Sequence, residues 1–187
     1  QALFRGIEQA DSVTLDPHKG LFLPYGTGGL VVKRKADLIA AHELRGEYMP
    51  DLNFEQAHLD PFSLSVELSR EHRGLKVALP LMLHGEQAFK DALNEKLELT
   101  RYLEKELKQI KRIEVLNQPQ LSTIAFCLPD LDNDENQAVL EAINAGGKVY
   151  LSGTMLRGRY ALRVSILSHR THRIQVDELL SEIHRVT

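Results

Sequence analysis

The sequence has little of what disulfide-stabilised, membrane-spanning and nucleic-acid-binding proteins need. Its 187 residues include one cysteine, Cys127, so no internal disulfide can form, and we expect a reducing, cytoplasmic setting. No apolar run approaches the ~20 residues of a membrane span. A net charge of −3 provides no basic surface for nucleic acid or an anionic membrane. We therefore expect neither nucleic acid nor a membrane as a partner.

An initiator methionine and a recognisable signal peptide are also absent, since the chain begins at Gln1. Internal repeats and low-complexity segments are missing too. Hydrophobic residues make up 43% of the sequence, which is enough for one or two modest cores. The first residues are typical of the middle of a helix that leads into a strand. We therefore expect the chain to be a fragment of a longer protein.

Two predicted strands near the N-terminus flank a polar connection. The segment Asp11–Leu15 is β-rich and predicts a short buried strand, which should end at Pro17 because proline cannot donate to a sheet ladder. Leu30-Val31-Val32 predicts the second strand. The glycines around Thr27 indicate a tight strand connection and lack the spacing of a dinucleotide fingerprint. Connections of this kind carry the chemistry of many α/β proteins.

The following segment alternates between helical and aperiodic stretches. Ala36–Leu44 predicts a helix, and the polar stretch Arg45–Pro61 predicts a long loop, which is usually functional or mobile. Helical spacing resumes over Ser63–Arg73. Pro80 is then expected to interrupt an apolar stretch, and Gly85 to mark a break.

The second half predicts a long helix followed by a small α+β domain. Apolar residues recur near a 3.6-residue period over Gly85–Ile110, which is long enough to join two domains. The later segments predict strands at Ile113–Leu116, Ser122–Leu128, Lys148–Ser152 and Tyr160–Leu167, and helices at Asn133–Ala145 and Val176–Val186. Gly146-Gly147 should stop the first of these helices. We predict an α/β fold in which residues 1–85 end a large domain and residues 86–187 form the linking helix and a small α+β domain.

Lys19 lies just past the first predicted strand, between His18 and Gly20. A lysine amine is normally protonated, but desolvation or a nearby cation lowers its pKa and frees it to attack a carbonyl group. Position alone favours an ordinary exposed lysine.

The residues around Lys19 change this interpretation. The string D-S-V-T-L-D-P-H-K (Asp11–Lys19) resembles the cofactor-lysine motif of the group II pyridoxal-phosphate-dependent amino-acid decarboxylases. This family includes the aromatic amino-acid, glutamate, histidine and cysteine-sulfinate decarboxylases. The resemblance implies the C-terminal part of a fold type I PLP-dependent transferase-like protein, in which Lys19 faces a buried pocket and forms the Schiff base with pyridoxal 5'-phosphate. It implies that His18 helps to hold the cofactor phosphate, and that Asp16, where many members have asparagine, is a cofactor-binding position.

Three further stretches resemble the same family. Tyr48 stands downstream of Lys19, where the family has a loop tyrosine that protonates the substrate carbon. The stretch Arg70–Gly85, which opens with R-E-H-R-G-L-K and continues as an apolar run to a glycine, resembles a family pattern. The spacing of Arg70, Arg73 and Lys76 predicts one shared helix face. Leu162–His172 resembles the strand of the C-terminal domain, with Leu162, Val164 and Ile166 facing one way and Arg163 the other. We assign no catalytic role to the last two stretches.

The resemblance also implies a reaction and an assembly. The parent protein would be a homodimeric carboxy-lyase that converts a small-molecule L-amino acid to its amine and carbon dioxide. The fragment alone would be inactive, because the family's aspartate for the pyridine nitrogen, ring-stacking histidine and most phosphate ligands precede the lysine. Two alternatives stay open: a PLP-dependent carbon–carbon lyase or aminotransferase-like enzyme, and a non-catalytic, oligomer-forming remnant. The net charge does not discriminate between acidic and aromatic substrates.

Other candidate residues favour structural roles. His169 and His172 have no third ligand at a spacing typical of metal sites, so we interpret them as surface or packing histidines and expect no metal. Cys127 lies in an apolar stretch and is expected to be a small buried hydrophobic residue.

Overall fold

The computed structural model describes residues 4–42 and 61–187, and the chain divides into two compact units. The first unit is made of the described residues of Gln1–His18 and Leu23–Met82, and the second of Lys19–Phe22 and Leu83–Thr187. The boundary expected between residues 85 and 86 concerns the domains of the whole protein and stays a prediction. Within the described residues, no helix combines the length and apolarity that crossing a bilayer requires.

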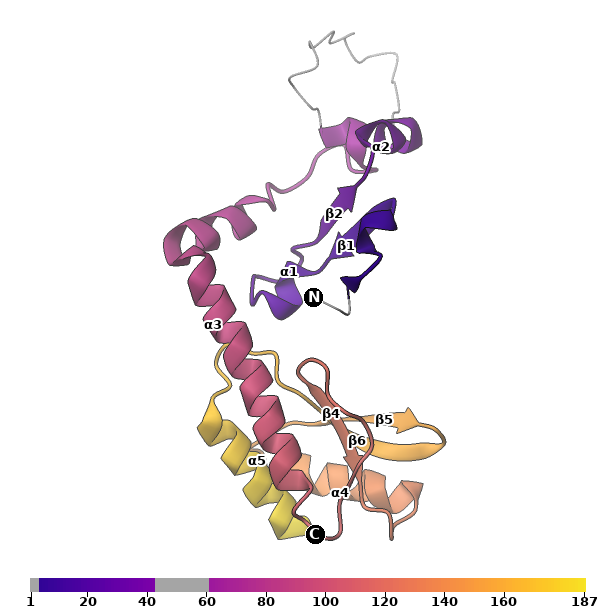
Figure 1. The fold of residues 1–187 in the computed structure, drawn as a ribbon, viewed down its shortest axis with the longest axis vertical. Helices are drawn as coiled ribbons and strands as arrows, with labels where there is room; N and C mark the ends of the chain where they lie inside the picture. Colours follow the sequence, from indigo (N-terminus) through magenta and orange to yellow (C-terminus); the bar gives the residue numbers. More distant parts are fainter. Residues whose placement is uncertain (1–3, 43–60) are drawn as a thin grey trace, which may run out of the picture. The chain divides into compact units, whose positions relative to one another are not determined.

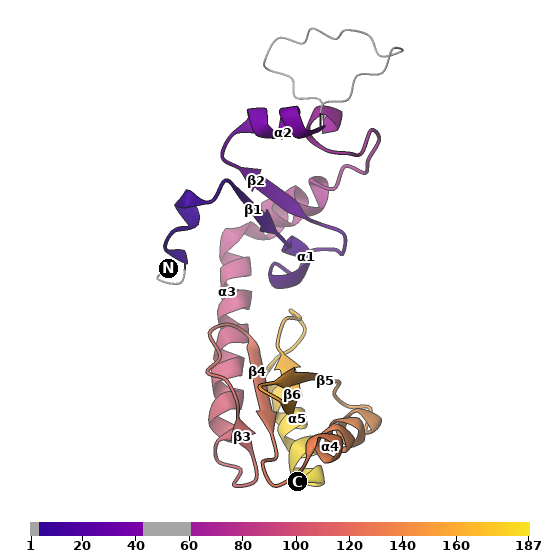
Figure 2. The ribbon, with the colours of Figure 1, turned by 90° about the vertical axis from the view of Figure 1, so that its right-hand side faces the viewer.

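An antiparallel ribbon of two strands forms the centre of the first unit (Figure 2). Strand β1 (Ser12–Leu15) pairs with β2 (Gly29–Val32), with Ser12 opposite Val32 and Leu15 opposite Gly29. A 3₁₀ helix, η2 (Ile7–Gln9), precedes β1, and the short helix α1 (Pro17–Gly20) follows it. Helix α2 (Lys35–His42) comes after β2. Both predicted strands, the end of the first before Pro17 and the helix after the second are thus confirmed.

The prediction that the first strand is buried is wrong for this chain. Leu15 in β1 is 51% exposed, and Leu30 and Val31 in β2 are 50% and 57% exposed. The residue types of this segment indicate a β-strand, but burial of the strand depends on a second layer of structure that packs against it. In the described part of the chain these strands form only a two-stranded ribbon, which cannot bury its own faces.

The helical spacing over Ser63–Arg73 was also misleading. A 3₁₀ helix, η3 (Pro61–Leu64), is followed by irregular chain as far as residue 74. The Arg73 guanidinium lies 3.2 Å from the Glu67 carboxylate, and the Lys76 ammonium 3.0 Å from that of Glu71. These partners are six and five positions apart, a spacing that a helix face does not bring together. The prediction that Arg70, Arg73 and Lys76 share a helix face is therefore wrong.

Helix α3 (Leu75–Leu107) contributes residues to both units. It continues through Pro80, so the predicted interruption there is wrong. Proline's fixed φ is compatible with a helix, although in the second turn it removes one hydrogen bond and its ring crowds the preceding turn. The break predicted at Gly85 is confirmed, because its φ of 73° and ψ of 162° are not helical and its lack of a side chain permits them. The helix ends three residues before the predicted end at Ile110.

The second unit is a four-stranded antiparallel sheet with helices packed against it (Figure 1). Its strand order is β3-β4-β6-β5, built from β3 (Glu114–Val115), β4 (Thr123–Cys127), β5 (Ser152–Leu156) and β6 (Arg159–Ser165). Helix α4 (Asn133–Ala145) connects β4 to β5, and α5 (Arg173–Val186) ends the chain beside α3. The predicted α+β organisation of this part is confirmed.

One predicted strand of the second unit lies in the wrong place. Strand β5 begins at Ser152, whereas Lys148–Ser152 was predicted. The side chain of Asn144 explains the shift, because its Nδ2 donates to the Leu151 carbonyl at 3.0 Å and its Oδ1 accepts from the Leu151 N–H at 2.8 Å. Both backbone groups that a strand would use for pairing at Leu151 are therefore engaged by a side chain.

A single core joins the helices to one face of the sheet. Its members come from α3, β4, α4, β6 and α5, together with the connections beside them: Leu99, Leu103, Leu107, Ile124, Phe126, Leu140, Ile143, Leu151, Leu162, Val164, Ile166, Val176, Leu179, Leu180 and Ile183. Leu162, Val164 and Ile166 lie in this core, which confirms the predicted alternation around β6. Cys127 is 1% exposed, as predicted.

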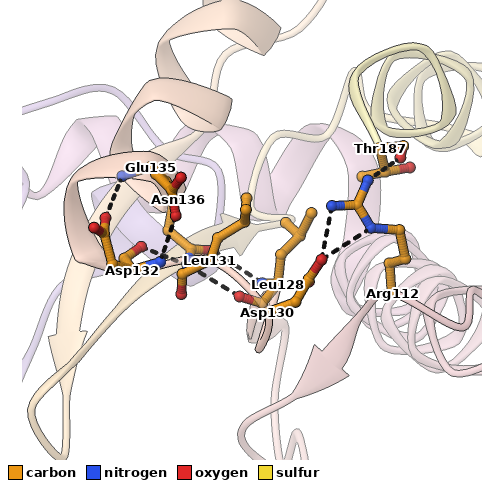
Figure 3. A network of polar contacts seen from close by, with 8 residues as sticks. All are labelled: Arg112, Leu128, Asp130, Leu131, Asp132, Glu135, Asn136 and Thr187. Carbon is orange, nitrogen blue, oxygen red and sulfur yellow. Dashed lines mark hydrogen bonds and ion pairs between the residues drawn. The ribbon is translucent and has the colours of Figure 1, made fainter.

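A polar network fixes the start of α4 (Figure 3). Asp132 accepts from the Glu135 N–H, and the Glu135 carboxylate accepts from the Asp132 N–H, each at 2.8 Å, so the two residues form a capping box. The Asn136 side chain is buried and forms hydrogen bonds to backbone atoms of Leu128, Leu131 and Asp132. Hydrogen bonds from the buried Asn136 side chain therefore stabilise the backbone of the connection from β4 to α4.

Candidate functional site

The D-P-H-K-G segment forms the end of β1 and helix α1. Pro17 is buried at the first helical position, where its missing N–H costs nothing. The Pro17 carbonyl accepts from the Leu23 N–H, and the Lys19 carbonyl accepts from the Phe22 N–H, both at 3.2 Å. Phe22 closes this turn in the left-handed region, with a φ of 57°. The chain around the lysine is therefore a short, folded-back turn.

His18 is held by the backbone of the turn that leads into β2. Its Nδ1 lies 2.7 Å from the carbonyl oxygen of Thr27. A carbonyl oxygen only accepts, so Nδ1 must be the donor, and Nε2 is then the ring nitrogen that can contact a ligand. The ring of Tyr25 meets the His18 ring edge-on, with centroids 5.0 Å apart. The imidazole is thus fixed by one hydrogen bond and one aromatic contact.

Thr27 is the buried member of this arrangement. It is 1% exposed, and its Oγ1 donates to the Pro24 carbonyl at 2.6 Å. The sequence interpretation gave the glycine-rich stretch around Thr27 only the role of a strand connection, and it did not single out Tyr25. The sequence feature that could have pointed to Thr27 is a polar residue between two glycines, nine positions after His18. This feature indicates a partner for His18 only once the hydrogen bond between the two residues is known.

Lys19 and Asp16 lie on either side of this anchored histidine and are both exposed. The expectation that the Lys19 amine faces a buried pocket stays a prediction for the whole protein. Tyr48 lies outside the described residues. The predicted site residues that the structure describes are therefore Asp16, His18 and Lys19, and their proposed roles stay predictions.

The chemistry of this donor set fits a phosphorylated aldehyde. A primary amine can condense with an aldehyde, and an imidazole nitrogen can bind a phosphate oxygen. Both groups come from adjacent residues, Lys19 and His18, on one short turn. Residues 4–42 and 61–187 contain no group of three or more histidine, cysteine or acidic side chains arranged to hold a metal ion.

The two histidines weighed as metal ligands have other contacts. His172 Nδ1 lies 2.6 Å from Oε1 of Glu95, on α3. The ring of His169 packs edge-on against the ring of Phe22, with centroids 6.1 Å apart and both residues in the second unit. These contacts agree with the predicted packing and surface roles.

Comparison with known proteins decides the family. The sequence model described as the pyridoxal-dependent decarboxylase conserved domain matches residues 1–129. The chain belongs to the pyridoxal-dependent decarboxylase family. The resemblance inferred from Asp11–Lys19 is thereby confirmed, as is the α/β fold class, because solved decarboxylase structures match almost the whole chain.

Several relatives within the family are named as decarboxylases of aromatic amino acids. The aromatic-L-amino-acid decarboxylase of Bacillus atrophaeus is 30% identical over 97% of this chain and 40% of its own length. Tyrosine decarboxylase 2 of Arabidopsis thaliana is 31% identical over 92% of this chain and 33% of its own length. The structure of Catharanthus roseus tryptophan decarboxylase in complex with L-tryptophan covers 98% of this chain, with a TM-score of 0.86 and 27% identity, and 40% of that chain is covered. The chain thus spans about two fifths or less of these relatives.

Proposed function

We propose that the whole protein is a pyridoxal-phosphate-dependent amino-acid decarboxylase in which Lys19 binds the cofactor covalently. The observation that carries the proposal is the anchored His18 beside Lys19, in a chain that belongs to the pyridoxal-dependent decarboxylase family. The substrate would be an L-amino acid, released as its amine and carbon dioxide. The relatives' names make tyrosine, tryptophan and other aromatic amino acids the first substrates to test.

Pyridoxal phosphate supplies, when bound, an electron sink for the electron pair that a departing carboxylate leaves on the substrate carbon. The residues of this chain would place and serve that group. The Lys19 amine would bind its aldehyde carbon, and Nε2 of His18 would bind its phosphate. Tyr48 would deliver a proton from its phenol oxygen to the substrate carbon once carbon dioxide has left. Asp16 would contribute to the cofactor site from the residue before α1.

The proposed role of Lys19 carries a chemical requirement. A lysine reacts with an aldehyde through its neutral amine, which desolvation or a nearby cation favours. We propose that the chain alone is inactive, because the aspartate for the pyridine nitrogen, the ring-stacking histidine and most phosphate ligands implied by the family resemblance precede Lys19 and lie outside this chain. We also propose that the whole protein is a homodimer in the cytoplasm. Light scattering on the purified protein tests the dimer, and fractionation of the source cells tests the location.

The cofactor lysine can be identified chemically. The whole protein is loaded with pyridoxal phosphate, treated with borohydride to fix the carbon–nitrogen bond, and digested for peptide mapping. We expect the label on the peptide that contains Lys19, and we expect a Lys19→Arg variant to lose it. A matched control is Lys33→Arg, at an exposed lysine just after β2. Label on another lysine in the wild-type protein would refute the assignment.

Product analysis separates the decarboxylase from its alternatives. The loaded protein is incubated with aromatic amino acids, glutamate and cysteine sulfinate. A primary amine and carbon dioxide in equal amounts are expected. An aldehyde formed without carbon dioxide would indicate a carbon–carbon lyase, and a keto acid formed without carbon dioxide would indicate an aminotransferase-like enzyme. Absence of cofactor binding by the whole protein would support the non-catalytic remnant.

A further inference from the structure

The hydrogen bond between His18 and Thr27 determines which nitrogen of the imidazole meets a ligand. Nδ1 donates to the Thr27 carbonyl, so a neutral His18 carries its proton on Nδ1 and a lone pair on Nε2. The Thr27 carbonyl accepts from Nδ1 in either protonation state of the ring, so Nε2 is the ring nitrogen left to meet a phosphate oxygen.

The position of that carbonyl depends on the side chain of Thr27. The Thr27 hydroxyl donates to the Pro24 carbonyl at 2.6 Å and is buried with the rest of the residue, which is 1% exposed. This bond closes the turn Pro24–Thr27 from the inside. Gly26 adopts a φ of +80° within the turn, a conformation that side-chain-bearing residues rarely adopt. The turn is therefore fixed by one side-chain hydrogen bond and one glycine, and it presents the Thr27 carbonyl to His18.

We propose that Thr27 is a positioning residue for the cofactor phosphate, acting through the tautomer and orientation of His18. This inference rests on the proposed function, since it assumes that His18 binds the phosphate of pyridoxal phosphate. Thr27 itself touches the imidazole only through its backbone carbonyl. Position 27 therefore requires a small side chain that carries a hydroxyl group and can be buried beneath the turn. Valine has nearly the same shape but cannot donate to Pro24, whereas serine can.

Cofactor affinity and the state of the His18 ring provide two independent measurements on the whole protein. The dissociation constant of pyridoxal phosphate is measured by absorbance titration of the apo protein for the wild type, Thr27→Val and Thr27→Ser. Nitrogen NMR of histidine-labelled apo protein, with His18→Gln for assignment, reports which ring nitrogen carries the proton. Thr154→Val, in β5 of the second unit, is the matched control for loss of a threonine hydroxyl.

We expect Thr27→Val to weaken cofactor binding roughly tenfold or more, the effect of misplacing one hydrogen bond to a charged group. Thr27→Ser should restore most of the affinity, and Thr154→Val should not change it. In wild-type apo protein the neutral His18 ring should be protonated on Nδ1, and Thr27→Val should lose that preference. In a His18→Gln background, Thr27→Val should weaken binding no further, because its effect passes through the imidazole.

Three results would overturn the inference. The first is a folded Thr27→Val protein that binds pyridoxal phosphate with wild-type affinity, and the second is a neutral His18 ring protonated on Nε2 in the wild type. The third is a loss of cofactor affinity on Thr27→Val that is the same with and without His18. The NMR result needs neither cofactor nor a folded valine variant. A wild-type protein that does not bind pyridoxal phosphate would instead overturn the proposed function. The two failures are therefore distinguishable.

Discussion

The carboxylate of Glu182 lies 2.7 Å from the Nη2 atom of Arg185 while its side chain is only 3% exposed. Lys148, in the connection between α4 and β5, approaches the other carboxylate oxygen at 2.9 Å. The hydrogen bond from Lys148 and then that from Arg185 lower the pKa of Glu182 below its usual range. Helix α5 is therefore joined to the α4–β5 connection through a buried, ionised carboxylate.

The stability of the second unit should consequently depend on pH in the acid range. The depressed pKa of Glu182 stabilises the folded state above the unfolded pKa of about 4.3, and this stabilisation is lost as the pH falls toward the folded pKa. Glu182→Gln should lower the free energy of unfolding at pH 7 and flatten its pH dependence, measured by urea unfolding between pH 3 and pH 7. Glu178→Gln, at an exposed position on α5, is the control. Equal pH profiles for the Glu182 variant and the wild type would contradict the role of this carboxylate.

Asn136 should be important for the stability of the β4–α4 connection. Its Oδ1 accepts from the Leu128 N–H at 2.9 Å, and both groups are buried. Asn136→Ala leaves that N–H without its acceptor, so we expect a loss of about 1–3 kcal/mol in the free energy of unfolding. Gln137→Ala removes an amide from the exposed neighbouring position and should change stability by no more than about 0.5 kcal/mol. Chemical denaturation of both variants makes the comparison, and similar losses would rule out a special role for Asn136.

Gly153 in β5 makes room for the ring of Tyr160 in β6. A Cβ at residue 153 would clash with the Tyr160 hydroxyl group, so Gly153→Ala forces the ring to move. Because the hydroxyl is the far end of a half-buried side chain, we expect a loss of about 1 kcal/mol in the free energy of unfolding. The clash disappears when the ring is removed, so Gly153→Ala should cost much less in a Tyr160→Leu background. Additive effects of the two substitutions in a double-mutant cycle would show that the ring is not responsible.

Tyr48 provides a prediction on activity in the whole protein. Removal of its phenol proton by Tyr48→Phe should lower kcat for amine formation by about 10²–10⁴, the usual contribution of a positioned general acid. Pyridoxal phosphate binding should change little, because Lys19 and His18 are retained. Tyr150→Phe, at a residue that is 85% exposed, is the matched control. Wild-type kcat in the Tyr48 variant would exclude it as the proton donor.

The sequence was most informative where local signals agreed with one another. The bounds of α4 were predicted to the residue, with Gly146-Gly147 as the stop signal, and the structure adds an Asp132–Glu135 capping box at the start of the helix. The alternation around β6 placed Leu162 and Val164 in the core. The motif that ends at Lys19 indicated the family without structural help. In each case the feature is determined by a few residues that are close together in the sequence.

The sequence was least informative where contacts between distant residues decide the outcome. Strand β5 starts later than predicted because the Asn144 side chain takes the backbone groups of Leu151. Helix α3 passes Pro80, a residue that normally kinks or ends a helix, and breaks at Gly85 instead. Thr27 escaped notice because its relationship to His18 is a backbone hydrogen bond across nine residues. Such contacts leave no periodic pattern in the sequence.

Because Cys127 is buried, the reactivity of its thiol reports local unfolding of the second unit. Burial raises the pKa of the thiol despite the opposing effect of Arg159, whose Nη2 lies 2.7 Å from the sulfur. Alkylating reagents attack thiolates that they can reach, so the native protein should react slowly at neutral pH. The modification rate at residue 127 then measures how often the sheet of the second unit opens, without any engineered label.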